Sequence, residues 1–240
     1  MAHFLGRFIQ RIVILTGAGI SAESGVPTFR DADGLWEKHD PMDIATPEAF
    51  ARDPALIHRF YNERRNKLAS VEPNTAHTAL AQLQKYFDGE VFLVTQNVDD
   101  LHERGGSEQV CHMHGGLQAM LCTACEGRLP ALMDYDANSV CPACASRGTL
   151  RPDIVWFGEI PYFMGEIEAR LSDCDLFIAI GTSGLVYPAA GFVQQASFSG
   201  ATTVEINREL SDVTDLFHHQ RQGLATTEVA GLVRALLGRD

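Results

Sequence analysis

The sequence predicts an α/β protein in which a doubly wound parallel sheet carries a second, smaller lobe. Three observations lead to this fold class: short apolar runs rich in β-branched residues, helical patterns that separate them, and two long interruptions of that alternation. Strands of a parallel sheet are buried on both faces, which gives such runs. A chain of 240 residues is long enough for one core of this kind with a smaller lobe attached.

The predicted strands are apolar along their whole length instead of alternating between polar and apolar residues. Helical patterns separate them, which favours the strand–helix–strand units of a doubly wound sheet. The four runs cover residues 11–16 (RIVILT), 91–95 (VFLVT), 175–182 (DLFIAIGT) and 202–207 (TTVEIN).

Two segments depart from this alternation, and we interpret them as insertions that together form the smaller lobe. Residues 43–87 show helical patterns only, and Asn74 is a suitable N-cap for the last of these helices. Residues 119–149 show little periodicity and hold two pairs of cysteines. The cleft between this lobe and the sheet is the expected site. The main domain is assigned to residues 1–42, 88–118 and 150–240.

Charge and composition limit the partners that the protein can have. The formal net charge is −12, and no basic stripe suits nucleic acid. The acidity is compatible with lysine-rich protein partners, although solubility alone is the favoured explanation. No run is long enough to cross a bilayer, and Arg7 and Arg11 interrupt the apolar start, so no signal peptide is expected. We expect a cytoplasmic protein.

Four of the six cysteines form the pattern C-x2-C-x15-C-x2-C. In a cytoplasmic chain this spacing indicates a metal site, and four thiolates around one zinc ion leave no position for water. The zinc is therefore expected to be structural. Cys111 and Cys174 are expected to be packing residues. The predicted zinc ligands are Cys122, Cys125, Cys141 and Cys144.

A glycine-rich turn follows the first predicted strand, in ILTGAGISAESGVPTFR. Gly17, Gly19 and Ala22 match the G-x-G-x-x-G/A pattern that brings backbone N–H groups close to a pyrophosphate. Such glycines also occur in ordinary turns. Dehydrogenases place an acidic residue about 20 residues later, at the end of the next strand. Here that distance falls in WEKHDPMD, which has acidic residues but no strand.

Five motifs of the chain resemble those of the sirtuins and occur in the same order. They are TGAGISAESGVPTFR, TQNVDDLHERGG, HMHGG, the cysteine pairs and IGTS. The likeness runs from about Ile12 to the C-terminal helix. Sirtuins are NAD-dependent protein-lysine deacylases, so the resemblance implies a Rossmann-like domain with a lobe made of a helical module and a zinc ribbon. It also implies that NAD is consumed, with release of nicotinamide and transfer of the acyl group to ADP-ribose.

By this resemblance His114, in HMHGG, is the general base that activates a ribose hydroxyl, a role that suits an imidazole that is neutral near pH 7. His112 lies two residues earlier and is not the base by its motif position. Thr28 stands where the family commonly has an acidic residue, which marks a subfamily. The residues implied to bind NAD are Gly17, Ala18, Gly19, Ser21, Ala22, Phe29, Arg30, Trp36, Gln96, Asn97, Asp99, Gly181, Thr182, Ser183, Asn207 and Ala225.

The helical pattern LIHRFYNERRNKL places Tyr61 and Arg64 on one face, with Arg64 inside an apolar stripe. Taken alone, this arginine would be expected to extend outward or to form a structural ion pair. By resemblance, the Tyr-x-x-Arg pair marks sirtuins that remove succinyl and malonyl groups, with Arg64 facing the distal carboxylate. Ala45 matches a small residue that widens this pocket. Bacterial members with this pair also deacetylate, so both activities are predicted.

The segment VWFGE matches one that holds the substrate peptide, mainly through its backbone, and implies peptide contacts at Val155, Phe157 and Gly158. Strand or loop packing is the alternative for these residues. Alternative functions are a protein ADP-ribosyltransferase at the same site, an NAD(P)-linked oxidoreductase, and a zinc-ribbon binding module without catalysis. Acylated-lysine proteins are the expected partners, with no nucleic acid and no membrane, and the oligomeric state is left open.

Overall fold

The structure is a computed structural model, and it describes residues 2–28 and 40–239. Its main element is a six-stranded parallel sheet in the order β11-β10-β9-β3-β4-β5. Numbered along the chain, these strands follow the order 3-2-1-4-5-6 of a Rossmann sheet, which confirms the predicted fold class. The strands are β3 (Arg11–Thr16), β4 (Glu90–Thr95), β5 (Cys111–His112), β9 (Leu176–Ile180), β10 (Thr202–Asn207) and β11 (His219–Gln222).

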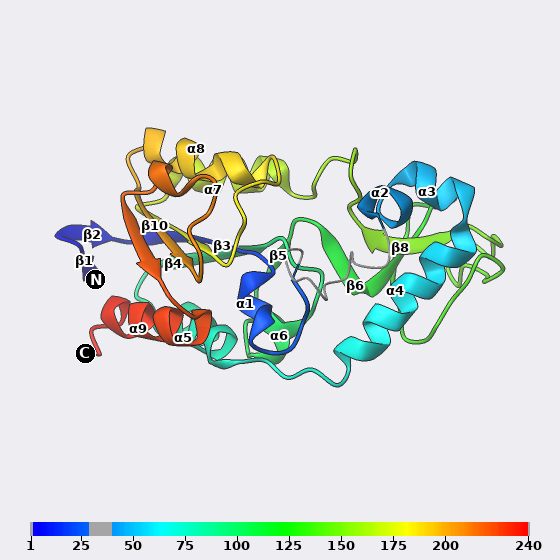
Figure 1. Cartoon of the computed structure of the whole chain (residues 1–240), viewed down its shortest axis with the longest axis horizontal. Coiled ribbons are helices and arrows are strands. Elements are labelled where there is room, and N and C mark those ends of the chain that lie inside the picture. Colours follow the sequence, from blue (N-terminus) through cyan, green and yellow to red (C-terminus); the bar gives the residue numbers. More distant parts are fainter. Residues whose placement is uncertain (1, 29–39, 240) are drawn as a thin grey trace.

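Helices cover both faces of this sheet, as Figure 1 shows. On one face lie α5 (Thr75–Tyr86) and α9 (Ala225–Leu236), and on the other lie α7 (Met164–Asp173) and α8 (Phe192–Phe198). The central strands are buried almost throughout, so their side chains feed two separate apolar clusters, one on each face. This explains the continuous apolar runs in the sequence.

The smaller lobe combines three helices with a three-stranded antiparallel sheet, and lies beside the main sheet in Figure 1. The helices are α2 (Pro41–Ile44), α3 (Pro47–Arg52) and α4 (Pro54–Leu68). Each begins with a proline after a capping Asp40, Thr46 or Asp53, whose side chain accepts a backbone N–H of the first turn. The strands are β6 (Gly115–Cys122), β7 (Arg128–Pro130) and β8 (Leu150–Ile154).

Other elements were not expected from the sequence. The chain starts with a hairpin of β1 (Ala2–Phe4) and β2 (Arg7–Ile9), and α1 (Gly19–Ala22) and α6 (Leu101–Arg104) are single turns. Residues 150–154 form β8, which pairs with β6 in the smaller sheet. The division of the chain into two domains stays a prediction. No helix within the described residues is long and apolar enough to cross a membrane.

Candidate active site

The candidate site lies where the carboxyl ends of β3, β4 and β9 meet, at the point where the strand order reverses. Ligands of doubly wound proteins bind at this position. A pocket at this edge is lined by Gln96, Thr182 and Gly184, among others. Of the predicted residues, Phe29, Arg30 and Trp36 lie outside the described part of the chain.

The glycine-rich turn after β3 packs directly against the end of β9. Gly17 donates its N–H to the Ile180 carbonyl and Gly19 to the Gly181 carbonyl, each at 2.9 Å. Gly181 has φ +63°, and a Cβ there would lie 2.6 Å from the Ile20 nitrogen. These glycines therefore allow two loops to meet backbone to backbone, in addition to the approach of a phosphate. Ala18 is the N-cap residue of α1, and Ala22 is its last residue.

A buried polar network lies beneath this turn. The Ser21 hydroxyl donates to Asp99 (3.1 Å), accepts from the Asn97 amide (3.2 Å) and lies 3.4 Å from His77 Nε2. Asn97 and Asp99 are only 7% and 6% exposed. Burial raises the pKa of Asp99, although hydrogen bonds from Leu101 and Ser21 oppose that change. The network thus joins three predicted residues to His77, which the sequence did not single out.

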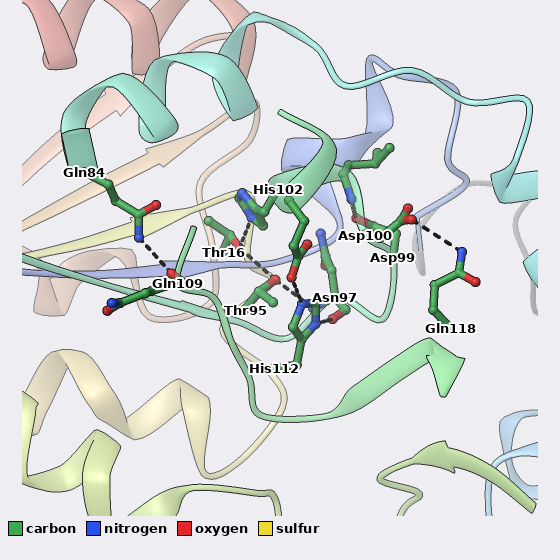
Figure 2. Close-up of polar contacts among 12 residues, drawn as sticks. Thr16, Gln84, Thr95, Asn97, Asp99, Asp100, His102, Gln109, His112 and Gln118 are labelled. Atoms are coloured by element: carbon green, nitrogen blue, oxygen red, sulfur yellow. Dashed lines mark hydrogen bonds and ion pairs between the residues drawn. The ribbon is translucent and has the colours of Figure 1, made fainter. Parts of the chain in front are cut away.

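A second layer of this network holds the two strand ends together, as Figure 2 shows. The Thr16 hydroxyl donates to Thr95 at 2.8 Å and lies 2.9 Å from His102 Nε2, while Thr95 accepts the Asn97 N–H. Burial holds the pKa of His102 well below its usual value, so His102 is neutral. Thr16 and Thr95 begin two of the motifs quoted from the sequence, but no role was predicted for them, because their contact arises only when two distant strands pair.

The two histidines of HMHGG have opposite environments. Both ring nitrogens of His112 face acceptors, the Asn97 carbonyl at 3.2 Å and the Glu103 carboxylate at 2.7 Å (Figure 2). Burial opposes a charge on His112, but the Glu103 carboxylate outweighs it and raises the pKa. Both ring nitrogens of His112 are thus occupied, so this ring offers no free lone pair to a substrate proton.

Within the part of the chain that the structure describes, the His114 ring has one hydrogen bond, between Nδ1 and the Gln96 carbonyl at 3.0 Å. A carbonyl only accepts, so Nδ1 carries the proton and Nε2 keeps a free lone pair. Burial lowers the pKa of His114, against the hydrogen bond to Gln96, so its imidazole is neutral at pH 7. His114 is therefore the histidine of this motif that can act as a base.

The ends of β9 and β10 are tied to each other. The Asn207 amide donates to the Thr182 carbonyl at 2.6 Å, and the Ser183 hydroxyl accepts the Leu185 N–H. Ala225 starts α9, but its side chain is 8% exposed and packs in the apolar cluster between α9 and the sheet. The structure thus brings Thr182, Ser183 and Asn207 to the site edge, and places the Ala225 side chain in the core.

On the other side of the site, helix α4 presents the predicted acyl-binding pair. Tyr61 is 3% exposed, and its apolar cluster also contains Ala45. Arg64 is half-buried, with its guanidinium over the Phe60 ring at 5.6 Å. Burial lowers the pKa of Arg64, while an ionised Tyr61 or Asp99 would act in the opposite direction. Within residues 2–28 and 40–239, Arg64 forms no ion pair with a carboxylate.

The segment after β8 bridges the site and the helical module. Val155 donates its N–H to the carbonyl of His114, and Phe157 donates its N–H to the carbonyl of Ala45, each at 2.9 Å. The Phe157 side chain is 46% exposed, and Gly158 has φ +89° with open space around its Cα. Trp156 lies between Val155 and Phe157 in the chain, is 2% exposed and packs into the apolar cluster of Tyr61, and the sequence alone assigned it no role.

The four paired cysteines come together as predicted. Their sulfur atoms lie within 4.8 Å of one another, with Cys122 and Cys144 at 3.7 Å and Cys125 and Cys141 at 4.0 Å. Four thiolates on a tetrahedral zinc ion have sulfur–sulfur distances of roughly 3.8 Å, so the residues fit a structural zinc site. Cys174 is buried in the core and Cys111 is half-buried.

Comparison with known proteins places this architecture in one family. Residues 17–188 match the model of the Sir2 family, and the chain belongs to that family. It is 52% identical over 230 residues to an NAD-dependent protein deacylase of Vibrio vulnificus, covering 95% of this chain and 94% of the relative. It is 55% identical over 234 residues to an NAD-dependent protein deacylase of Leishmania major, covering 94% and 95%.

Solved structures agree with this assignment. The chain is similar to a Sir2 homologue in complex with NAD, with a TM-score of 0.87 and 38% identity, covering 95% of this chain and 90% of the other. It is also similar to a Sir2 protein in complex with a p53 peptide and NAD+, with a TM-score of 0.77 and 30% identity, covering 96% and 93%.

Proposed function

We propose that this protein is an NAD-dependent protein-lysine deacylase that removes both acetyl groups and the acidic succinyl and malonyl groups. NAD-dependent deacylation itself is supported by the family, by relatives named as such deacylases and by structures of relatives with NAD. The finer part, the range of acyl groups, rests on one observation: the half-buried Arg64 follows the buried Tyr61 by three positions on α4, with no protein carboxylate on Arg64 among the described residues.

An anion would stabilise this half-buried guanidinium, because moving its charge out of water is costly unless a partner of opposite charge compensates. A planar guanidinium binds a carboxylate through two parallel N–H groups, and the Tyr61 hydroxyl adds a further donor. The distal carboxylate of a succinyl or malonyl group supplies that anion. The small Ala45 leaves room for the longer acyl chain in the same apolar cluster.

The proposed reaction uses groups from both sides of the site. NAD, the co-substrate, is proposed to lie along the glycine turn and the ends of β9 and β10, with its nicotinamide near Asn97 and Asp99. His114 Nε2 takes the proton of a ribose hydroxyl, and its Nδ1–H bond to Gln96 holds the ring in that tautomer. The substrate backbone is proposed to pair with the segment containing Val155, Phe157 and Gly158. One zinc ion held by the four cysteines supports the lobe.

The acyl preference is tested with Arg64→Met and a matched control, Arg59→Met, on the exposed face of the same helix. Matched acetyl-lysine and succinyl-lysine peptides are compared by kcat/KM. Arg64→Met is expected to reduce desuccinylation by about 10- to 100-fold, since a charge-assisted hydrogen bond contributes about 1.5–3 kcal/mol. The kcat/KM of Arg64→Met for the acetyl-lysine peptide should stay within about twofold of the value for the unaltered protein. Equal losses on both peptides would contradict the proposed role of Arg64.

Alternative functions differ in their products. An ADP-ribosyltransferase would leave ADP-ribose attached to protein, and an NAD(P)-linked oxidoreductase would change nicotinamide absorbance without releasing nicotinamide. The structure gives no support to the second: the strand that follows the glycine turn is β4, and it ends at Thr95 instead of an acidic residue that could hold a ribose.

A further inference from the structure

The indole of Trp156 makes a hydrogen bond to the proposed acyl-binding tyrosine. Trp156 Nε1 donates to the Tyr61 hydroxyl oxygen at 3.0 Å, although the two residues are 95 positions apart. Both side chains are buried, at 2% and 3% exposure, and the rings are 6.4 Å apart. An indole N–H can only donate, so the tyrosine oxygen must accept in this contact.

Trp156 is itself held on two sides. The Arg151 guanidinium stacks on the indole with its Cζ 3.5 Å from the ring centre. Both oxygens of Glu159 accept from Arg151, at 2.7 and 3.0 Å, and one of them also accepts the Trp156 backbone N–H at 2.8 Å. Arg151 further donates to the Ile154 carbonyl at 2.9 Å. A ring fixed in this way has little freedom to rotate away from Tyr61.

This arrangement determines what Tyr61 can offer to a ligand. With one lone pair of its oxygen taken by the indole, the phenolic hydrogen is directed away from Trp156. Within the described residues, the Tyr61 hydroxyl donates to no protein acceptor. Burial raises the pKa of Tyr61, so the hydroxyl keeps its proton and remains a donor at neutral pH.

We infer that Trp156 is a positioning residue for acyl selectivity: it orients the Tyr61 hydroxyl toward the distal carboxylate of an acidic acyl group. Arg151 and Glu159 act one step further away, by fixing the indole. This inference rests on the proposed function, because it assumes that Tyr61 and Arg64 bind that carboxylate. An acetyl group has no distal carboxylate, so its removal does not depend on this orientation.

A double-mutant cycle tests the inference on the full-length, zinc-loaded protein. Trp156→Phe, Tyr61→Phe and the double variant are compared on matched succinyl-lysine and acetyl-lysine peptides. Trp156→Phe is expected to raise KM for the succinyl peptide about tenfold, the value of one buried hydrogen bond, with kcat and deacetylation within about twofold. In the Tyr61→Phe background, Trp156→Phe should cause no further selective loss. Tyr86→Phe, on the exposed end of α5, is the control.

A second variant separates the hydrogen bond from packing. Benzothienylalanine at position 156 replaces the indole N–H with sulfur and keeps the ring shape, so it should reproduce the selective KM effect while lowering thermal stability no more than Trp156→Phe does. Loss of both activities in parallel for this variant, or additive effects in the cycle, would overturn the inference. If Arg64→Met and Tyr61→Phe both leave desuccinylation intact, the proposed acyl class fails instead. Arg64→Met and Tyr61→Phe could instead reduce desuccinylation selectively while neither variant at position 156 does so. In that case the proposed acyl class stands and only the role of Trp156 fails.

Discussion

At the level of single residues, the site depends on which nitrogen of each histidine carries a proton. His114 and His112 are two positions apart, yet one is held neutral with a free Nε2 and the other is paired with Glu103. The motif alone identified His114. The physical reason for its role could not be found in the sequence, because it comes from the Gln96 carbonyl, 18 positions away.

The lowered pKa of His114 predicts the pH dependence of the reaction. If His114 is the base, kcat/KM should fall on the acid side with a limb centred below pH 6.5, because burial lowers the pKa of His114 from that value. His114→Ala should reduce kcat by about 10²- to 10⁴-fold. Initial rates across pH 5.5–8 check this, with circular dichroism at each pH as the control for folding. An acid limb centred above pH 7 would show that another group is titrating.

At the level of elements, the zinc ribbon supports the strand that carries the site. Strand β6 runs from Gly115, next to His114, to the zinc ligand Cys122, and β8 pairs with it before continuing into Val155. A Cβ on Gly115 would lie 1.9 Å from the Asp153 carbonyl oxygen, so only glycine allows this pairing. The sequence predicted the cysteine cluster, but not that the sheet beside it extends to Gly115, next to His114.

Removing one zinc ligand should therefore disturb more than the ribbon. Cys141→Ser should lower the zinc content from about one per chain to near zero and cost several kcal/mol of lobe stability, because metal binding contributes folding energy. Hydrogen exchange in β6 and β8 should speed up, and deacylation should fall with it. Cys174→Ser, in the core of the main domain, is the control and should keep its zinc. Normal exchange in β6 and β8 without zinc would refute this coupling.

At the level of the whole molecule, the sequence predicted the parallel sheet and its four long strands, because apolar runs and helical periods are local signals. It did not predict that α5, within residues 43–87, packs on the main sheet. Asn74 indeed caps α5. The short strands β5 and β11 and the N-terminal hairpin were missed, because their pairing depends on distant neighbours. Likewise, the contacts of Trp156 and the layer of Thr16, Thr95 and His102 arise only after folding.

Buried neutral histidines should make the folded protein sensitive to acid. Burial lowers the pKa of His77 from 6.5 to about 4, and that of His102 well below 6.5. The unfolded chain therefore binds more protons, and stability is lost as pH falls below 6.5. Between pH 7.5 and 5.5, the free energy of unfolding should decrease by about 1 kcal/mol for each of these residues.

Urea unfolding at the two pH values, with zinc present, measures this loss. His77→Gln should remove about 1 kcal/mol of the pH dependence, whereas His219→Gln, at an exposed position, should leave it unchanged. An unaltered pH dependence in His77→Gln would mean that His77 is not held neutral by the fold. His112, whose pKa is raised, contributes in the opposite direction and is common to both variants.

The central claim is that the site consumes NAD to deacylate lysine. The most direct test measures nicotinamide released from NAD in the presence of matched acetyl-lysine and succinyl-lysine peptides, with the products identified by mass spectrometry. Nicotinamide release is expected to depend on either peptide and to be accompanied by the deacylated lysine and O-acyl-ADP-ribose. No peptide-dependent release from folded, zinc-loaded protein, or ADP-ribose attached to protein in place of O-acyl-ADP-ribose, would contradict it.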